Sequence, residues 1–141
     1  MISMKRSSSY EKGRRYEYKL MEELKKRGFF VIRSPASGRR SKRFFYPDIV
    51  AIRKKRILIV ESKMYSDKRG LYIPKNQWKK LKWIQNITGG EAYVSVYYKD
   101  IAEFILVHID TYDKKTERYY VWSRKSVIEK GRTIDELVRE C

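Results

Sequence analysis

Cysteine, histidine and long apolar runs are almost missing from this chain, and each shortage excludes a class of protein. The single cysteine, Cys141, is the last of 141 residues, which excludes a disulfide framework and a cysteine-based zinc site. The single histidine, His108, lies in an apolar run and is predicted to be a strand residue rather than a ligand or general base. No apolar stretch is long enough to cross a membrane, and no secretory signal is recognisable. We therefore expect a cytoplasmic protein without membrane contact.

Acidic residues are also few, and the resulting positive charge is unevenly placed. The chain has 34 lysines and arginines against 17 aspartates and glutamates, a formal net charge of +17. Residues 1–90 hold 25 of these cations and 7 of the acids, a net of +18, while residues 91–141 hold 9 and 10, a net of −1. A large positive excess indicates a polyanionic partner. Nucleic acid is the favoured partner, because a generally basic ribosomal-type protein more often spreads its charge.

The most informative motif is a Pro-Asp pair at 47–48 followed, after twelve residues, by Glu-Ser-Lys at 61–63. Two apolar runs lie between these positions, at 49–52 and 57–60, and each predicts a strand. The basic tetrad 53–56 between the runs predicts a tight hairpin connection. The two halves of the motif thus flank one antiparallel hairpin.

The hairpin predicts that three charged side chains meet at one edge of a buried sheet. Side chains two residues apart share a face of a strand, so Glu61 and Lys63 emerge together at the end of the second strand. The first strand begins beside that end, which places Asp48 next to them. Two carboxylates suit Mg²⁺, which activates a water and offsets charge on a phosphodiester. Lys63 is then expected to orient that water or to stabilise the transition state.

Each of these residues also has a purely structural interpretation. Asp48 could cap the turn after its proline, and Glu61 and Lys63 could be surface residues at a strand end, because short patterns recur by chance. Glu17 lies on the predicted core face of a helix over residues 11–27. Its carboxylate either extends past the core to solvent, pairs with a basic neighbour at the boundary of the core, or completes a metal site.

The remaining pattern predicts an α/β fold, a single domain with a central mixed sheet flanked by helices. Residues 1–10 are expected to be a flexible basic N-terminus, and 11–141 the domain proper. The basic and aromatic segment 33–47 is expected to be a mobile loop that contacts phosphates. Further strands are predicted at 29–34, 71–73, 92–98, 102–109 and 118–122, and further helices at 74–88 and, with a capping box, from residue 133.

Further motifs follow in a fixed order along residues 12–109. They are Lys12-Gly13 with Glu17 four residues after the glycine, residues 33–38 (RSPASG), 47–51 (PDIVA) and 61–63, Tyr72-Ile73 with Gln77, and residues 88–90 (TGG). In order and spacing they resemble the archaeal Holliday junction resolvases, a branch of the restriction-endonuclease-like PD-(D/E)xK nucleases. The likeness fades beyond residue 110 and does not cover the C-terminal segment 110–141.

The resemblance implies a restriction-endonuclease-like fold and an endodeoxyribonuclease. Such an enzyme resolves four-way (Holliday) junctions by paired symmetric nicks during recombination and repair, beside the nucleoid. The expected cofactor is Mg²⁺, with Mn²⁺ as a substitute. The implied metal ligands are Glu17, Asp48 and Glu61, with Lys63 as catalytic lysine, Ser37 as catalytic loop serine and Gln77 as a supporting residue.

The charge asymmetry then becomes a DNA-binding surface around the site. The cations expected to contact DNA are Lys12, Arg14, Arg15, Arg33, Arg39, Arg40, Lys42, Arg43, Arg53, Lys54, Lys55, Arg56, Lys68 and Arg69.

The resemblance also implies a homodimer, because two symmetric nicks need two identical sites. We expect the dimer interface in the neutral C-terminal half, since a strongly basic face repels its own copy. Its candidate residues are Phe104, Ile105, Leu106, Tyr119, Tyr120 and Trp122. No motif identifies a sliding clamp or a branch-migration helicase as a further partner.

Two alternatives stay open at this point. The chain could be a related PD-(D/E)xK nuclease for another DNA structure, because the motif residues recognise a phosphate and not a branch. It could also be a non-catalytic DNA-binding relative, although all four charged motif positions are intact.

Overall fold

A computed structural model describes residues 3–34 and 46–140 of the chain. Most of the expected loop 33–47 lies outside these ranges, including Ser37, Arg39, Arg40, Lys42 and Arg43. None of the helices in the described residues is long and apolar enough to span a membrane.

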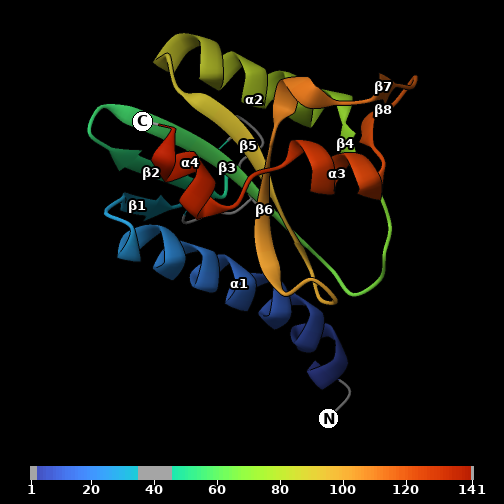
Figure 1. Cartoon of the computed structure of the whole chain (residues 1–141). Helices are drawn as coiled ribbons and strands as arrows, with labels where there is room; N and C mark the ends of the chain where they lie inside the picture. Colours follow the sequence, from blue (N-terminus) through green and yellow to red (C-terminus); the bar gives the residue numbers. More distant parts are fainter. Residues whose placement is uncertain (1–2, 35–45, 141) are drawn as a thin grey trace.

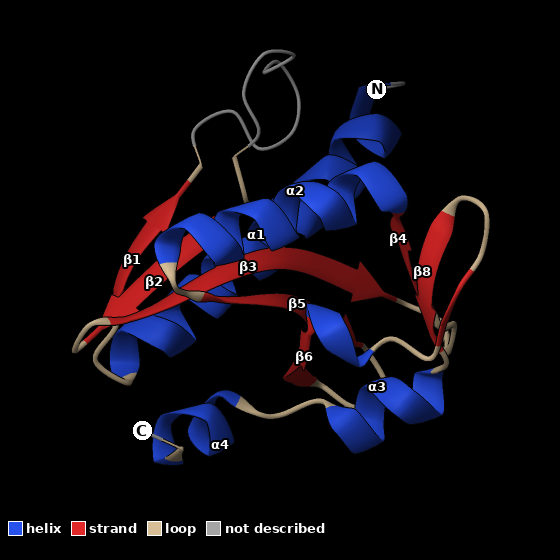
Figure 2. Ribbon diagram, turned by 90° about the horizontal axis from the view of Figure 1, so that it is seen from above, coloured by secondary structure: helices blue, strands red, loops and turns tan. Residues whose placement is uncertain are grey.

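A five-stranded sheet runs through the middle of the molecule (Figure 2). Its strands, in spatial order, are β1 (Phe30–Arg33), β2 (Ile49–Arg53), β3 (Arg56–Tyr65), β5 (Glu91–Tyr98) and β6 (Glu103–His108). Strands β3 and β5 are parallel, and the other neighbouring pairs in this sheet are antiparallel. The predicted central mixed sheet is therefore confirmed.

A second, smaller sheet was not predicted from the sequence. It joins β4 (Leu71–Pro74), β8 (Tyr119–Trp122) and β7 (Lys114–Lys115) in that spatial order. The strand β8 pairs with β4 on one side and with β7 on the other, antiparallel in both cases. The two-residue strand β7 is too short to give a recognisable pattern in the sequence.

Both faces of the five-stranded sheet are covered, with α2 on one side and α1 on the other (Figure 1). Helices α1 (Ser3–Lys26) and α4 (Ile134–Arg139) share a core with one face, through Leu20 and Leu137 among others. Helices α2 (Lys75–Thr88) and α3 (Arg124–Lys130) and the smaller sheet share a core with the other face, through Leu81, Trp122 and Val127 among others. The predicted α/β domain with flanking helices is confirmed.

The turn between β2 and β3 has the geometry that a tight hairpin requires. Lys54 and Lys55 have φ angles of 48° and 70°, and Arg53 pairs with Arg56 across the turn. Two central residues with positive φ match the twist of the flanking strands. The predicted tight connection is therefore confirmed.

The ends of several elements differ from the prediction. Helix α1 begins at Ser3 instead of residue 11. Strand β3 continues to Tyr65, because its parallel pairing with β5 extends that far, so Glu61 and Lys63 lie within the strand rather than at its end. Helix α3 was not predicted; the side chain of Ser123 caps its N-terminus.

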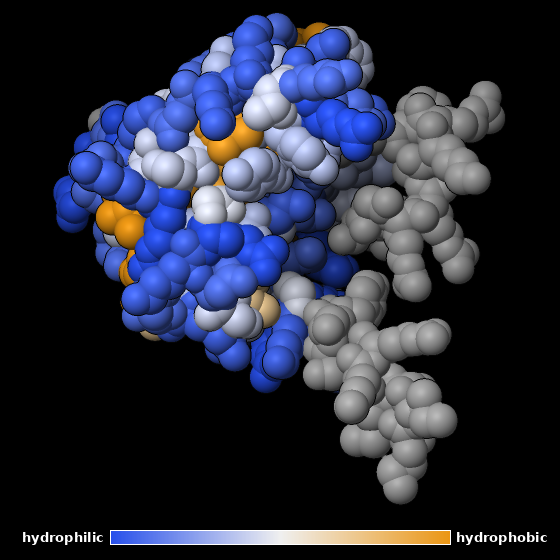
Figure 3. All heavy atoms as spheres, turned by 90° about the vertical axis from the view of Figure 1, so that its right-hand side faces the viewer, coloured by the Kyte–Doolittle hydropathy of each residue, from blue (hydrophilic) through white to orange (hydrophobic). Residues whose placement is uncertain are grey.

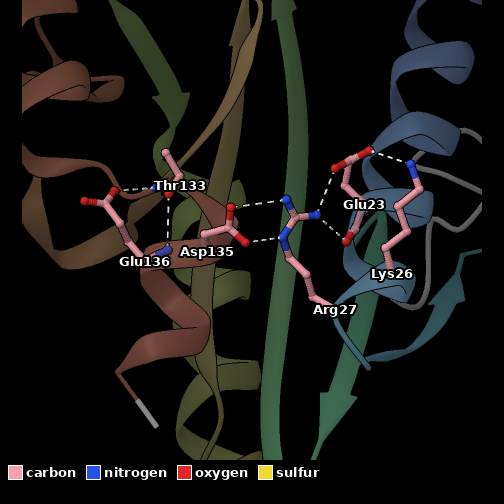
Figure 4. Close-up of polar contacts among 6 residues, drawn as sticks. All are labelled: Glu23, Lys26, Arg27, Thr133, Asp135 and Glu136. Carbon is pink, nitrogen blue, oxygen red and sulfur yellow. Dashed lines mark hydrogen bonds and ion pairs between the residues drawn. The ribbon is translucent and has the colours of Figure 1, made fainter.

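An ion-pair cluster ties the end of α1 to the start of α4 (Figure 4). Arg27 Nε donates to Asp135 Oδ1 at 2.6 Å, and Arg27 Nη1 donates to Glu23 Oε1 at 2.8 Å. The Glu136 N–H donates to Thr133 Oγ1 at 3.2 Å, and the Thr133 N–H donates to Glu136 Oε1 at 2.8 Å. The second pair of bonds is the predicted capping box, which is confirmed.

Candidate active site

Asp48 and Glu61 lie opposite each other across β2 and β3. The pairing of Ile49 with Val60 places the two acidic residues side by side. The Asp48 backbone N–H donates to Glu61 Oε1 at 3.1 Å, and the Ser62 backbone N–H donates to Asp48 Oδ2 at 2.9 Å. The structure thus brings together the two carboxylates of the motif, as the hairpin geometry predicted.

Glu61 is buried beneath the first turn of α2. Only 5% of the residue is exposed, and Gln77 Nε2 donates to Glu61 Oε2 at 2.8 Å. Oε1 of Glu61 is therefore held by the backbone just before β2, and Oε2 by the side chain of Gln77 on α2. The interpretation of Glu61 as an ordinary surface residue is wrong. A buried carboxylate lowers stability unless it is well compensated, so its presence here indicates a function.

The carboxylates at this site disfavour one another's charge. Burial raises the pKa of Glu61, and the negative charge of Asp48 raises it further, while the Lys63 ammonium acts in the opposite direction. Burial also raises the pKa of Glu17, again with a contribution from Asp48, against the effect of Arg33. Carboxyl groups with raised pKa values and a shared like-charged neighbour mark a candidate functional site.

Glu17 reaches this cluster from α1. Its Oε1 accepts a hydrogen bond from Arg33 Nε at 2.8 Å, and the two side chains are only 12% and 19% exposed. The pairing expected of a boundary glutamate is therefore present, and the repulsion by Asp48 shows that the same carboxylate lies near the motif residues. Sequence reasoning missed the partner: Arg33 was expected to contact DNA.

The described residues that flank residues 35–45 meet beside Asp48. The Ser34 backbone N–H donates to the Asp48 carbonyl oxygen at 2.9 Å, and Ser34 is buried. Tyr46, two residues before Asp48, is 48% exposed. The described residues on either side of the segment that was predicted to contact phosphates therefore lie next to the carboxylates.

The chemistry of the cluster suits a hard divalent cation. Glu17, Asp48 and Glu61 supply only carboxylate oxygens, and a cation between them would offset the repulsion that raises their pKa values. Across residues 3–34 and 46–140, however, no three Asp, Glu, His or Cys side chains already form a metal-holding group. Glu17 is engaged by Arg33, so the preformed part of the site is the pair Asp48 and Glu61.

The predicted DNA-contacting cations are not all near these carboxylates. Lys12, Arg14 and Arg15 precede Glu17 on α1, and Lys68 and Arg69 follow the end of β3. The basic tetrad 53–56 lies at the opposite end of the hairpin. Five residues of extended strand separate it from Asp48, a distance of roughly 17 Å.

Arg56, one member of that tetrad, is turned into the fold. Its side chain is 14% exposed, and its Nε donates to Glu91 Oε2 at 2.6 Å. Its Nη1 donates to the Leu137 carbonyl oxygen near the end of α4. The guanidinium therefore links β3 to β5 and α4, and the structure does not bring it together with the motif residues.

The predicted residues of the dimer interface are mostly unavailable. Phe104, Ile105, Leu106, Tyr120 and Trp122 are each no more than 9% exposed, because both faces of the sheet are already covered. That assignment is wrong for these five residues, and only Tyr119, at 38%, is exposed. Much larger exposed fractions occur on α2, where Trp83 is 61% and Ile87 60% exposed.

The whole chain from residue 8 onwards is similar to one protein family. A family model described as archaeal Holliday junction resolvase (hjc) matches residues 8–141. The similarity therefore continues through the C-terminal segment, past the point at which the motifs end.

Individual relatives agree with this family match. The chain is 31% identical over 132 residues to the crossover junction endodeoxyribonuclease Hjc of Sulfolobus acidocaldarius, an alignment that covers 94% of this chain and 90% of that protein. It is 29% identical over 133 residues to the protein of the same name from Sulfurisphaera tokodaii, with the same two coverages. The fold resembles that of Archaeoglobus fulgidus Hjc, a Holliday junction resolvase, with a TM-score of 0.79 and 30% identity over 89% of this chain and 99% of that one.

Proposed function

This chain belongs to the archaeal Holliday junction resolvase family, and from that premise we propose that it is an endodeoxyribonuclease that resolves four-way DNA junctions. The relatives are named crossover junction endodeoxyribonucleases, enzymes that hydrolyse phosphodiester bonds. The observation that carries the proposal is the buried Glu61 beside the half-buried Asp48, a pair held by Gln77 and Ser62 within a strongly basic protein.

Asp48 and Glu61 would hold a divalent metal, with Glu17 as the third ligand. Mg²⁺ is the proposed ion, with Mn²⁺ as a substitute, since both accept carboxylate oxygens. When bound, the metal supplies an activated water and offsets the charge on the scissile phosphate. Glu17 has to loosen its bond to Arg33 in order to contribute to metal binding.

The residues around the pair position it for this role. Gln77 fixes the orientation of the Glu61 carboxylate, and the Ser62 N–H fixes that of Asp48. Lys63 lies on the same face of β3 as Glu61, where its ammonium can orient the attacking water or stabilise charge in the transition state. Ser37, in the segment that starts and ends beside Asp48, is the proposed catalytic loop residue.

Lysines and arginines around the site would bind the DNA backbone. Lys12, Arg14 and Arg15 on α1 and Lys68 and Arg69 after β3 would supply phosphate contacts. Arg53, Lys54 and Lys55 at the hairpin turn would supply a further one, without Arg56, which is turned into the fold. The protein would act on DNA in the cytoplasm, beside the nucleoid.

Two nicks on opposing strands require two sites, so we assign the protein a homodimer. The exposed apolar pair Trp83 and Ile87 supports an interface on α2, because residues four apart share one face of a helix. This half of α2 follows its last lysine, Lys82, and so carries little charge of its own. Trp83→Glu should give a monomer in sedimentation velocity, whereas the control Ile128→Glu on α3 should remain a dimer. A dimer in both variants would place the interface elsewhere.

The test of the function compares an immobile four-way junction with a linear duplex of the same sequence, each incubated with protein and Mg²⁺. Paired symmetric nicks in the junction, absent from the duplex and from Asp48→Asn, are the expected result. Equal cleavage of both DNAs would indicate a related nuclease with another target. Tight binding without cleavage under any divalent metal would indicate a DNA-binding relative.

A further inference from the structure

The smaller sheet carries two exposed tyrosines on its outer face. Tyr72 on β4 is 53% exposed and Tyr119 on β8 is 38% exposed. Their rings meet edge to face, with centroids 5.8 Å apart and an interplanar angle of 86°. Pro74 is paired with Tyr119 and lies two residues after Tyr72, so the two tyrosines share one face of the sheet.

The core does not require this pair. The opposite face of the same sheet supplies Leu71, Ile73, Tyr120 and Trp122 to the core, and each is buried. In this edge-to-face contact the edge of one ring covers one face of the other, which leaves the remaining faces of the two exposed rings for a ligand. The side of the protein that carries β7 and β8 is mainly hydrophilic with small hydrophobic patches (Figure 3).

Cations flank the tyrosine pair. Lys75 follows β4, and its N–H donates to the carbonyl oxygen of Arg118, the residue before Tyr119, at 2.9 Å. Lys114 on β7 is exposed and is paired with Val121 of β8. Within residues 3–34 and 46–140, none of these three cations forms an ion pair. The acids next to them in the chain are Asp113, which pairs with Lys130, and Glu117. Aromatic rings among available cations are the combination that binds bases and backbone together.

The pair also lies close to the candidate active site along the chain. Strand β4 runs directly into α2, whose first turn carries Gln77, the residue bonded to Glu61. Tyr72 is five residues before Gln77, so at most roughly 18 Å of chain separates them. Successive base pairs are stacked about 3.4 Å apart along a strand, which puts the tyrosines within a few nucleotides of a phosphate at Glu61.

From these observations we propose that Tyr72 and Tyr119 form a stacking platform for the bases exposed at the branch point of a DNA junction, with Lys75, Lys114 and Arg118 on the adjoining backbone. In a linear duplex each base pair is covered by its neighbours, whereas a branch point exposes the faces of the terminal pairs. An aromatic platform therefore distinguishes a branch from a duplex. The carboxylates cannot do so, because they contact only a phosphate. This role rests on the proposed function and accounts for the preference of the enzyme for branched over linear DNA.

The test compares binding of a four-way junction and of linear duplex in the absence of divalent metal. The double variant Tyr72→Leu, Tyr119→Leu should bind the junction about 10-fold more weakly, since stacking on one base contributes roughly that factor or more. Its affinity for the duplex should be unchanged. The double Tyr→Phe variant keeps both rings and should bind as the wild type. The control Phe30→Leu removes another exposed aromatic ring, 66% exposed on β1, and should change neither affinity.

A 2-aminopurine base at the branch point reports stacking directly. Its fluorescence should change when the wild type or the Phe variant binds, and not when the Leu variant binds at saturating concentration. Circular dichroism and thermal unfolding verify that each variant is folded.

Equal losses on junction and duplex, or no loss on either, would overturn the stacking role. These outcomes differ from failure of the proposed function, which would appear as absent junction cleavage by the wild type itself.

Discussion

The β2–β3 hairpin carries charged side chains at both of its ends, but their surroundings differ. The charge at the turn has a partner of opposite sign, whereas the charges at the other end repel each other. At the turn, Arg56 and Glu91 are paired at 2.6 Å, and the hydrogen bond from Arg56 lowers the pKa of Glu91. At the other end, Glu61 is buried beside Asp48, and its pKa is raised by burial and by that neighbour. One end of the hairpin thus forms an ion pair with β5, and the other end holds two carboxylates whose like charges repel each other.

The difference separates charges that stabilise the fold from charges that the proposed metal ion would neutralise. Opposite charges in contact, such as Arg56 and Glu91, neutralise each other and need no further partner. Like charges held together by hydrogen bonds to Gln77 and Ser62 reduce stability, and the proposed metal ion would offset this cost. Substitutions at the two ends should therefore have opposite consequences, and the largest effects are expected beside the carboxylate pair.

Among substitutions of residues that surround the carboxylate pair, Lys63→Met should have the largest effect, a fall of about 100-fold or more in the rate of junction cleavage, because it removes the cation beside the pair. Single-turnover cleavage with excess protein measures this rate. Lys99→Met, the same change at an exposed turn position, is the control and should cleave at the rate of the wild type. Unimpaired cleavage by Lys63→Met would remove this residue from the mechanism.

Gln77→Ala should lower the cleavage rate roughly 10-fold, since a residue that orients a metal ligand typically contributes that much. The matched control is Gln85→Ala on the same helix. Gln85 Oε1 accepts a hydrogen bond from the Ala92 N–H at 2.8 Å, a contact remote from the carboxylates. Gln85→Ala should lower the melting temperature and leave the rate unchanged. Equal rates in the two variants would contradict the positioning role of Gln77.

Glu61→Gln and Glu91→Gln should shift the free energy of unfolding in opposite directions, each by about 1 kcal/mol. The first removes a buried repulsion, and Gln77 can turn its amide to accept instead of donate. The second breaks the pair with Arg56. Chemical denaturation without divalent metal measures both.

The pH dependence of these shifts should also differ in sign. Because the pKa of Glu61 is raised, its contribution to stability is lost as pH rises above the unfolded value near 4.5, so the advantage of Glu61→Gln should grow with pH. Because the pKa of Glu91 is lowered, its contribution is present above that value and is lost in acid, where Glu91→Gln should match the wild type. Parallel curves for both variants would contradict the comparison.

The smallest effect is expected at the turn. Lys54→Asn with Lys55→Gly removes two charges but suits the positive φ angles there, so stability should stay within about 0.5 kcal/mol of the wild type. Cleavage should be unchanged at moderate salt. The slope of log affinity against log salt should fall by about 1 for each phosphate that the two lysines neutralise in the wild type, equally for junction and duplex. A selective weakening of junction binding would give the turn a larger role than its distance from Asp48 allows.

The carboxylate end of the hairpin could be predicted from the sequence because it depends on local geometry. The period of two in a strand and the antiparallel register are enough to bring Asp48 next to Glu61. The capping box at Thr133 and Glu136 is local in the same way.

Other features depended on long-range packing that leaves no local pattern. Arg33 and Glu17 meet because β1 joins the sheet beside β2 and α1 packs against one face of that sheet. Phe104 and Trp122 were expected at an exposed interface because they are apolar and lie in a segment of low net charge. Both are instead buried by packing against elements that are distant in the sequence or were not predicted. Arg56 was part of a basic run, and its partner Glu91 lies 35 residues further along the chain.

Cleavage of an immobile four-way junction by wild type, Glu61→Gln and Glu91→Gln, side by side in Mg²⁺, tests the distinction between the two ends of the hairpin most directly. Paired nicks by the wild type and by Glu91→Gln, with none by a folded Glu61→Gln, are the predicted result. Cleavage by Glu61→Gln at the wild-type rate would contradict the assignment of the carboxylate pair Asp48 and Glu61 as the active site.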